Sequence, residues 1–229
     1  MKEQIPFAFP LRSEATFENY ITGRNAEIQR RLEDLSNAHA FQIIWLWGEQ
    51  GVGCTHLLHA SCHQLTTHHG QVGFVPSADL KLKSESLTGF QAFDAVAIDD
   101  VHLWLARERA ERNLVDLYQA LQSNAGILLL SSTKPPVQFD YCFNDLASRF
   151  GAAETYEVID LCDQGKMMFV QRQAELRGLQ LDDEVARYML TRCSRHLTDL
   201  LKMISNLDRH SLALNRRLTV PFVKQVLKV

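Results

Sequence analysis

Two kinds of segment are missing from this sequence of 229 residues: a membrane span and a paired-cysteine motif. No apolar run approaches the ~20 residues that a transmembrane helix needs. The opening stretch Met1–Pro6 lacks the continuous apolar core of a signal peptide. The five cysteines form no C-x-x-C pair, which favours reduced thiols and argues against a zinc ribbon. We therefore expect a cytoplasmic protein that does not associate with membranes.

The signatures of several enzyme classes are also absent. The sequence has no G-x-S-x-G nucleophile motif, no Cys/His catalytic pairing and no carboxylate pair of the glycosidase kind. His56, His59 and His63 fall at helical spacing, with Cys62 close by, but no recognisable metal site is completed on that turn. We expect no metal centre at these histidines.

Charge is unevenly distributed, although the net charge is only −3. Residues 1–160 carry 12 Lys and Arg against 20 Asp and Glu, whereas residues 161–229 carry 12 against 7. Two interpretations stay open: solvated helix faces, or a basic segment that closes over an anionic ligand. The overall acidity argues against a dedicated duplex-DNA binder, which would need a basic face.

A glycine-rich stretch stands between an apolar run and a helical segment. It matches the phosphate-binding pattern G-x-x-x-x-G-K-[ST] at Gly48, Gly53 and Thr55, but Cys54 occupies the lysine position. Glycines let backbone N–H groups approach a phosphate, and a following helix points its positive end at the same anion. The stretch therefore predicts a site that holds a nucleotide better than it hydrolyses one. The residues expected to contact the nucleotide here are Gly48, Glu49, Gln50, Gly51, Val52, Gly53, Cys54, Thr55 and His56.

From residue 41 onward, short apolar runs alternate with helical stretches. Such runs are typical of strands in a parallel sheet buried on both faces. The sequence therefore predicts an α/β fold with a five-stranded parallel P-loop sheet, with ligands at the carboxyl ends of the strands. The expected strands are Gln42–Trp47, Val72–Pro76, Ala95–Asp99, Gly126–Ser131 and Glu154–Ile159, and helices are expected at about 55–68, 79–90 and 107–123.

The last 69 residues change character, because they contain only helical patterns. Four helices are expected, at roughly Asp163–Arg177, Asp182–Cys193, His196–Leu214 and after Pro221. The predicted organisation is an extended tail over 1–12, an α/β nucleotide-binding domain over 13–160 and a small all-helical lid domain over 161–229.

Polar side chains follow two of the expected strands. Asp99 and Asp100 end one apolar run about 45 residues after the glycine loop. In a P-loop fold the first carboxylate holds Mg²⁺ beside the loop hydroxyl, here Thr55, and the second can polarise an attacking water. Ser131–Thr133 end the next strand, either beside the outer phosphate or as an ordinary strand end.

Two arginines have a functional and an ordinary interpretation. Arg149 precedes the last strand, where oligomeric P-loop proteins carry an arginine finger that reaches a neighbour's γ-phosphate. Arg195 opens a helix of the basic segment and would fold back on bound phosphates. For both, the alternative is a solvent-facing surface arginine.

Aromatic side chains precede the glycine loop. Phe17, Tyr20 and Gly23 belong to a cluster that would line a purine pocket, although core packing also explains the two aromatics. The tail is unusually apolar and either packs on its own domain or docks in a partner's groove. Its candidate anchors are Gln4, Ile5, Phe7 and Phe9.

Together these motifs resemble the AAA+ branch that contains the bacterial replication initiator DnaA, and within it the Hda family. The resemblance covers residues 13–229 and is carried by Thr16–Gly23, Gly48–Ala60, Ile98–Val101 and Leu146–Gly151. Leu218–Lys224 and the opening hexapeptide Gln4–Phe9 are similar to the Hda family in particular.

The resemblance implies a role in replication control. Hda-like proteins bind ADP or a similar nucleoside diphosphate, dock on the DNA-loaded sliding clamp of DNA polymerase III, and present an arginine to ATP-bound DnaA. Arg149 would be that finger, Arg195 a sensor-2-like arginine, and Thr133 would stand at the sensor-1 position. The branch also assembles nucleotide site to finger, so we expect a homo-oligomer.

Two departures shape this expectation. Cys54 makes intrinsic hydrolysis doubtful, and no segment follows the helical bundle, so direct sequence-specific DNA binding through a helix-turn-helix is not expected. The alternatives are a self-contained AAA+ ATPase, such as a helicase-loader or clamp-loader relative, and an inert scaffold with a decayed site.

Overall fold

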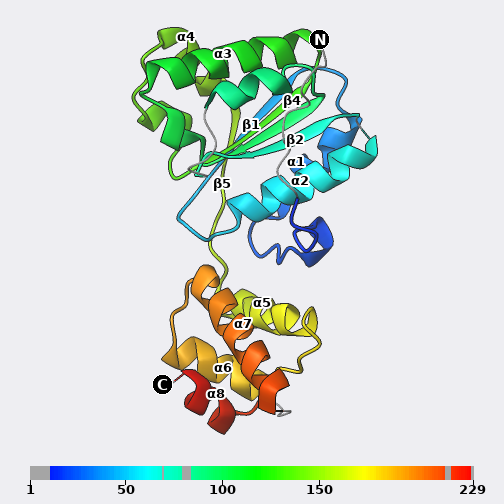
Figure 1. The fold of residues 1–229 in the computed structure, drawn as a ribbon, viewed down its shortest axis with the longest axis vertical. Coiled ribbons are helices and arrows are strands. Elements are labelled where there is room, and N and C mark those ends of the chain that lie inside the picture. Colours follow the sequence, from blue (N-terminus) through cyan, green and yellow to red (C-terminus); the bar gives the residue numbers. More distant parts are fainter. Residues whose placement is uncertain (1–10, 69, 79–83, 215–217, 228–229) are drawn as a thin grey trace. The chain divides into compact units, whose positions relative to one another are not determined.

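The computed structural model describes residues 11–68, 70–78, 84–214 and 218–227. The chain folds as two compact units (Figure 1). The first unit consists of the segment up to Tyr20 and of Asn25–Ile159. The second consists of Ile21–Arg24 and of the chain from Asp160 onward.

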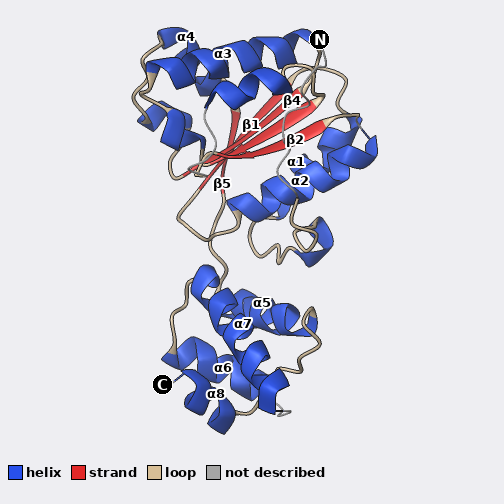
Figure 2. Ribbon diagram, viewed as in Figure 1, coloured by secondary structure: helices blue, strands red, loops and turns tan. Residues whose placement is uncertain are grey.

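A five-stranded parallel sheet forms the centre of the first unit (Figure 2). The strand order is β2-β3-β4-β1-β5, and every neighbouring pair is parallel. This arrangement confirms the predicted α/β class and the five-stranded P-loop sheet. The strands are β1 (Gln42–Trp47), β2 (Val72–Pro76), β3 (Ala95–Asp99), β4 (Ile127–Ser132) and β5 (Glu154–Glu157).

Helices connect these strands, and several connections include short 3-10 turns. The α-helices of this unit are α1 (Ala26–Glu33), α2 (Cys54–His68), α3 (Glu108–Ser123) and α4 (Asn144–Gly151). The 3-10 helices are η1 (Phe17–Asn19), η2 (Asp34–Asn37), η3 (Ser84–Phe90), η4 (Val101–Trp104) and η5 (Pro136–Gln138).

A helical stretch was expected over 79–90, and the described part is helical, but it is a 3-10 helix and not an α-helix. Residues Ser84–Phe90 form a 3-10 helix, whereas 79–83 lie outside the described residues. Thr88 and Gly89 are both poor α-helix formers, and Gly89 adds the larger backbone-entropy cost. The segment therefore settles into a tighter turn that still buries Leu87 and Phe90.

Both faces of the sheet are covered along β1–β4, which explains why these four strands are mainly apolar, whereas the edge strand β5 is polar and mostly exposed. On β1, Ile44 and Leu46 pack in the core cluster with α1 and α2, whereas Trp45 packs in the cluster with α3 and α4. On β4, Leu129 and Leu130 divide between the two clusters in the same way. Alternate side chains of a strand point to opposite faces, so each of β1–β4 supplies both cores. Figure 1 shows the two helical layers on either side of the sheet.

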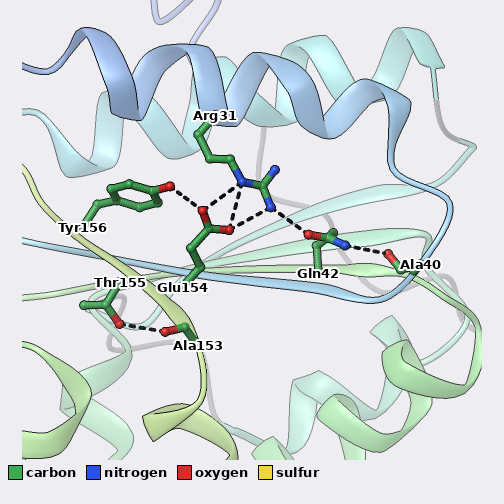
Figure 3. Close-up of polar contacts among 7 residues, drawn as sticks. All are labelled: Arg31, Ala40, Gln42, Ala153, Glu154, Thr155 and Tyr156. Carbon is green, nitrogen blue, oxygen red and sulfur yellow. Dashed lines mark hydrogen bonds and ion pairs between the residues drawn. The ribbon is translucent and has the colours of Figure 1, made fainter.

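The outer strand β5 is fastened to α1 by a polar network (Figure 3). The Arg31 guanidinium donates to both carboxylate oxygens of Glu154 at 2.8–3.0 Å, and its Nη2 also donates to Gln42 Oε1 at 2.7 Å. The Tyr156 hydroxyl donates to the same carboxylate. Burial alone would raise the pKa of Glu154, but the bonds from Arg31 and Tyr156 lower it overall. This network holds the short edge strand that leads toward Val158.

The described part of the second unit is helical (Figure 2). Gly178 adopts a left-handed φ of 72° after α5, as a helix-ending glycine does. One apolar core joins the four helices, with Leu200 and Ile204 of the longest helix fully buried. The helices are α5 (Asp163–Glu175), α6 (Asp183–Arg192), α7 (Leu197–Leu214) and α8 (Val220–Leu227). Across the described ranges of both units, no helix combines the length and apolar character that crossing a membrane requires.

Candidate functional site

The loop Gly48–Gly53 joins β1 to α2 and depends on its glycines. Gly51 and Gly53 have φ angles of 91° and 116°, which other residues rarely adopt. A Cβ atom on Gly48 would lie 2.7 Å from the carbonyl oxygen of Val158. Leu57 N–H donates to Gly53 O at 3.0 Å, so α2 begins directly after the loop. An anion in front of this loop would therefore meet the positive end of a 15-residue helix.

Three further loop residues differ in exposure. Glu49 and Gln50 are exposed, whereas Val52 is buried in the core cluster shared with α2. The loop is thus anchored from inside by Val52, while its polar residues face solvent. Their expected contacts with a nucleotide stay a prediction.

Cys54 is the first residue of α2, at the position where the phosphate-loop pattern has lysine. Burial, followed by the negative charges of Asp99 and Asp100, raises the pKa of the Cys54 thiol to about 12. The thiol is therefore uncharged at neutral pH. The loop keeps its backbone geometry but contributes no side-chain cation for the outer phosphates.

Thr55, Asp99 and Ser131 form one hydrogen-bonded network at the carboxyl ends of β3 and β4. Thr55 Oγ1 donates to Asp99 Oδ2 at 2.9 Å, and Ser131 Oγ donates to Asp99 Oδ1 at 2.5 Å. Asp100 N–H donates to Ser131 Oγ at 2.9 Å. The hydroxyl expected at the loop and the first expected carboxylate therefore lie together. Ser131, rather than the exposed Thr133, is the strand-end hydroxyl that contacts them.

The two carboxylates have different surroundings. Asp99 is 7% exposed, and burial raises its pKa, although the hydrogen bond from Ser131 opposes the shift. Asp100 is less buried and has a left-handed φ of 55°. This conformation turns the chain at the end of β3, so that consecutive aspartates occupy different environments.

The Thr55 and Asp99 oxygens suit a magnesium ion bound together with a nucleotide. Mg²⁺ commonly takes one or two protein oxygens and completes its shell with water and substrate phosphates. Elsewhere in the described ranges, no group of three or more His, Cys, Asp and Glu side chains is arranged to hold a metal.

Tyr20 and His56 lie together beside the loop. A Cβ atom on Gly53 would be 3.2 Å from the Tyr20 ring, and the Tyr20 and His56 ring centroids are 5.4 Å apart. Asn25 Nδ2 donates to the Tyr20 hydroxyl at 3.1 Å, and His56 Nε2 lies 2.8 Å from the carbonyl oxygen of Thr16. Burial raises the pKa of Tyr20 to about 12, despite the bond from Asn25. An aromatic surface therefore adjoins the phosphate loop.

The other two residues of the expected purine pocket are placed differently. Phe17 lies in η1 and is half-buried against the core cluster of α1 and α2. Gly23 belongs to the second unit, where its φ is 53° and a Cβ would meet the Leu161 side chain at 2.8 Å. Its part in a base pocket stays a prediction.

Arg149 lies on α4, and its side chain is 25% exposed. Its Nε donates to Asp145 Oδ2 at 2.8 Å, four residues earlier on the same helix. Its Cζ lies 4.9 Å from the centroid of the Tyr118 ring, which belongs to α3. Asp145 is itself 56% exposed. The guanidinium is therefore held at the surface of the first unit by two contacts that cost little free energy to break.

Arg195 lies in the second unit, before α7. Its side chain is 56% exposed, and Nη2 donates to Asp163 Oδ2 at 2.7 Å. Asp163 is the first residue of α5. The expected contact of Arg195 with phosphates stays a prediction.

Sequence reasoning did not assign a role to Asn25, which is 1% exposed. Its Nδ2 donates to Ile159 O and its Oδ1 accepts from Ile159 N–H, both at 2.9 Å. Asparagine just before α1 reads as a helix cap, yet the side chain makes no capping bond. Asn25 instead ties the chain after β5 to the start of α1, a pairing that sequence spacing does not reveal.

The candidate anchors of the tail, Gln4, Ile5, Phe7 and Phe9, lie outside the described residues.

Comparison with known families divides the chain near residue 160. Residues 11–156 match the model of the bacterial DnaA ATPase domain, and residues 163–227 match the model of the Hda lid domain.

Solved structures show the same fold at low sequence identity. Domain III of the replication initiation protein DnaA from Thermotoga maritima is 18% identical, with a TM-score of 0.83, over 96% of this chain and 98% of that chain. AMPPCP-bound DnaA from Aquifex aeolicus is 22% identical, with a TM-score of 0.70, over 85% of this chain and 65% of that chain. The RuvB Holliday junction branch migration motor from Thermotoga maritima is 16% identical, with a TM-score of 0.71, over 93% of this chain and 71% of that chain.

Proposed function

The chain belongs to the Hda family of DnaA-related AAA+ proteins, and from that membership we propose how it acts in the regulatory inactivation of DnaA. In this proposal it binds a nucleoside diphosphate, docks on the sliding clamp and supplies Arg149 in trans to the ATP held by DnaA. ATP hydrolysis by DnaA then ends its capacity to initiate replication.

The position of Arg149 carries the proposal. Its guanidinium lies at the surface of the first unit, paired with the more exposed Asp145. An ion pair of this kind contributes about 0.3–0.5 kcal/mol, and an exposed cation–π contact about 0.5–1 kcal/mol. A γ-phosphate presented by another subunit would easily replace both contacts. A guanidinium buried in an internal ion pair would have argued against the proposal.

The loop chemistry supports a diphosphate ligand. The uncharged Cys54 leaves the backbone N–H groups and the helix end to hold phosphates, with no lysine to favour the extra charge of a triphosphate. ADP or another nucleoside diphosphate is the proposed ligand, and Thr55 and Asp99 would contribute to holding Mg²⁺.

The proposed partners are DnaA and the sliding clamp. Docking on the clamp is assigned to the tail, whose resemblance to clamp-binding hexapeptides rests on Gln4, Ile5, Phe7 and Phe9. We also propose self-association, because a surface arginine and a nucleotide site on one chain favour head-to-tail assembly.

The decisive experiment measures ATP hydrolysis by DnaA with and without this protein and DNA-loaded clamp. The parent should accelerate hydrolysis, and Arg149→Ala should lose on the order of 10³-fold of that acceleration, since fingers in trans contribute about 10³–10⁵. Nucleotide and clamp binding should stay intact.

A matched control is Arg172→Ala, which removes another surface arginine that pairs with an acid on its own helix. It should stimulate as the parent does. If stimulation of DnaA requires the loaded clamp, replacing both Gln4 and Phe9 with alanine should abolish it. Stimulation by Arg149→Ala at the parent's rate would refute the proposal.

The alternative is a self-contained ATPase. The Thr55–Asp99–Ser131 network supports this alternative, because the oxygens of Thr55 and Asp99 could hold Mg²⁺ beside a nucleotide. Steady-state ATP turnover by the purified protein alone, lost on Asp100→Asn, would support this alternative over the first proposal.

A further inference from the structure

Glu111 is a fully buried acid that neither the nucleotide site nor the finger accounts for. It lies on α3 and is 0% exposed. A carboxylate in such a place is costly unless hydrogen bonds replace the lost water. Three backbone N–H groups do so. Ala106 N–H donates to Oε1 at 2.8 Å, Cys142 N–H donates to Oε1 at 3.0 Å, and Phe143 N–H donates to Oε2 at 3.0 Å.

These donors come from two segments far apart in the sequence. Ala106 lies between η4 and α3 and has a left-handed φ of 56°. Cys142 and Phe143 immediately precede α4, and Phe143 is the residue that caps it. Phe143 offers no side-chain oxygen to the helix end. Glu111 therefore supplies, from another helix, a negative charge beside the start of α4, where such a charge is favourable.

The direction of α4 decides where Arg149 points. The helix has only eight residues, and Leu146 and Phe150 anchor one face of it in the core. A helix of two turns is marginal alone, so its orientation depends on such anchors and on its first residues. The same α3 that carries Glu111 also carries Tyr118, which lies under the Arg149 guanidinium.

We propose that Glu111 is the positioning residue for Arg149: its three backbone hydrogen bonds fix the start of α4 and so fix the approach of the guanidinium to a neighbour's nucleotide. This inference rests on the proposed finger function of Arg149. Burial, followed by the charge of Glu111, raises the pKa of Tyr141, which places the same carboxylate at the centre of this segment.

Glu111→Gln tests the inference with almost no change in shape. An amide oxygen can replace only one carboxylate oxygen, so the NH₂ group must face at least one backbone N–H donor. If the amide oxygen takes the place of Oε1, the Phe143 N–H loses its acceptor. We expect the start of α4 to loosen while the core stays folded.

The assay is ATP hydrolysis by DnaA with loaded clamp, measured over a titration of the regulator. Glu111→Gln should lower the rate at saturation by on the order of ten- to a hundredfold, because a displacement of about 1 Å from reacting geometry can cost about 100-fold. The concentration giving half the maximal rate should not change, since the surfaces that form the complex are intact.

Ile28→Val serves as the stability control. Ile28 lies in the core cluster with α1 and α2, on the other face of the sheet from α4. It should lower thermal stability without lowering the saturated rate. A purely structural role for Glu111 predicts instead that both variants lose rate in proportion to stability, and that result would overturn the inference.

Arg149→Ala separates this inference from the proposed function. If Arg149→Ala stimulates as the parent does, the finger proposal fails, and the inference falls with it. If Arg149→Ala is inactive while Glu111→Gln keeps the parent's saturated rate, only the positioning role is overturned.

A second measurement needs no variant. Hydrogen exchange at the Cys142 and Phe143 amides of the parent should be as slow as at the central strands, because a buried acceptor protects both. Exchange at the rate of an open loop would overturn the inference.

Discussion

Replacing Cys54 with lysine would restore the positive charge that the phosphate loop lacks. The Cys54 thiol is uncharged at neutral pH, because burial and two neighbouring aspartates raise its pKa to about 12. Within the phosphate loop itself, only the backbone N–H groups and the end of α2 are then left to hold phosphates. Neither of these distinguishes strongly between a second and a third phosphate.

The size of the expected change follows from the charges at the site. An ammonium about 4 Å from a unit charge interacts by about 4 kcal/mol at an effective dielectric constant of ~20. Asp99 and Asp100 lie close to Cys54 and would share the new cation. We therefore use, in place of the Coulomb energy, the smaller free energy of a hydrogen bond to a charged group, which is about 1.5–3 kcal/mol. That corresponds to roughly a ten- to hundredfold gain for triphosphate over diphosphate.

Isothermal calorimetry with ATP and with ADP, each with Mg²⁺, measures this ratio. The parent should bind the two with comparable affinity, and Cys54→Lys should shift the ratio toward ATP. Cys54→Met is the matched control, because it lengthens the side chain without adding charge, and it should leave the ratio unchanged. A parent that already prefers ATP strongly, or a lysine variant with an unchanged ratio, would refute the reasoning.

Two further predictions concern stability. Asp99→Asn should raise the thermal midpoint by a few degrees in the absence of nucleotide, because a neutral amide replaces a buried carboxylate. Each kcal/mol of stability moves the midpoint of a protein of this size by about 2–4 °C. A lower midpoint, measured by calorimetry, would contradict this prediction. Burial, followed by the charges of Arg12, His63 and His56, lowers the pKa of His59 from 6.5 to about 4. Neutral His59 therefore stabilises the fold above pH 6.5, and this contribution is lost as pH falls toward 4. Denaturant unfolding from pH 7 to 4 should show that loss, and His59→Leu should flatten it.

Much of the fold was predictable because its signals are local. Three of the five strands have the expected bounds, and the other two end or begin within two residues of them. Apolar runs of this length suit a sheet that is buried on both faces, whichever order its strands take. The helix type over 84–90 was not predictable in the same way, because short 3-10 turns depend on what their side chains pack against.

The candidate site, like the fold, has parts that local sequence predicts and parts that depend on tertiary structure. The glycines and Cys54 could be identified from spacing alone, because a phosphate loop is a continuous segment. The strand-end hydroxyl that contacts Asp99 could not be identified from spacing, because it depends on how β3 aligns with β4. The register places Ile98 beside Leu130, so Asp99 falls next to Ser131 and not beside Thr133.

Glu111 shows what a pattern can and cannot indicate. It lies within the run Arg107–Arg112, which reads as a solvated helix start. It also shares the helical spacing of Leu114 and Tyr118, which are buried, and that spacing was an available signal. Its three backbone partners, however, come from segments 5 and 31–32 residues away. No spacing rule connects them.

The sequence by itself determined a glycine loop without its lysine, a sheet of the P-loop kind and a helical segment after it. These are properties of neighbouring residues, set by backbone conformation and by the period of apolar side chains. Only the tertiary structure decided that Ser131 supports Asp99, that Arg149 lies at the surface against Tyr118, and that Glu111 holds the start of α4. Each of these depends on distant segments being brought within hydrogen-bond or ring contact, which chain order does not specify.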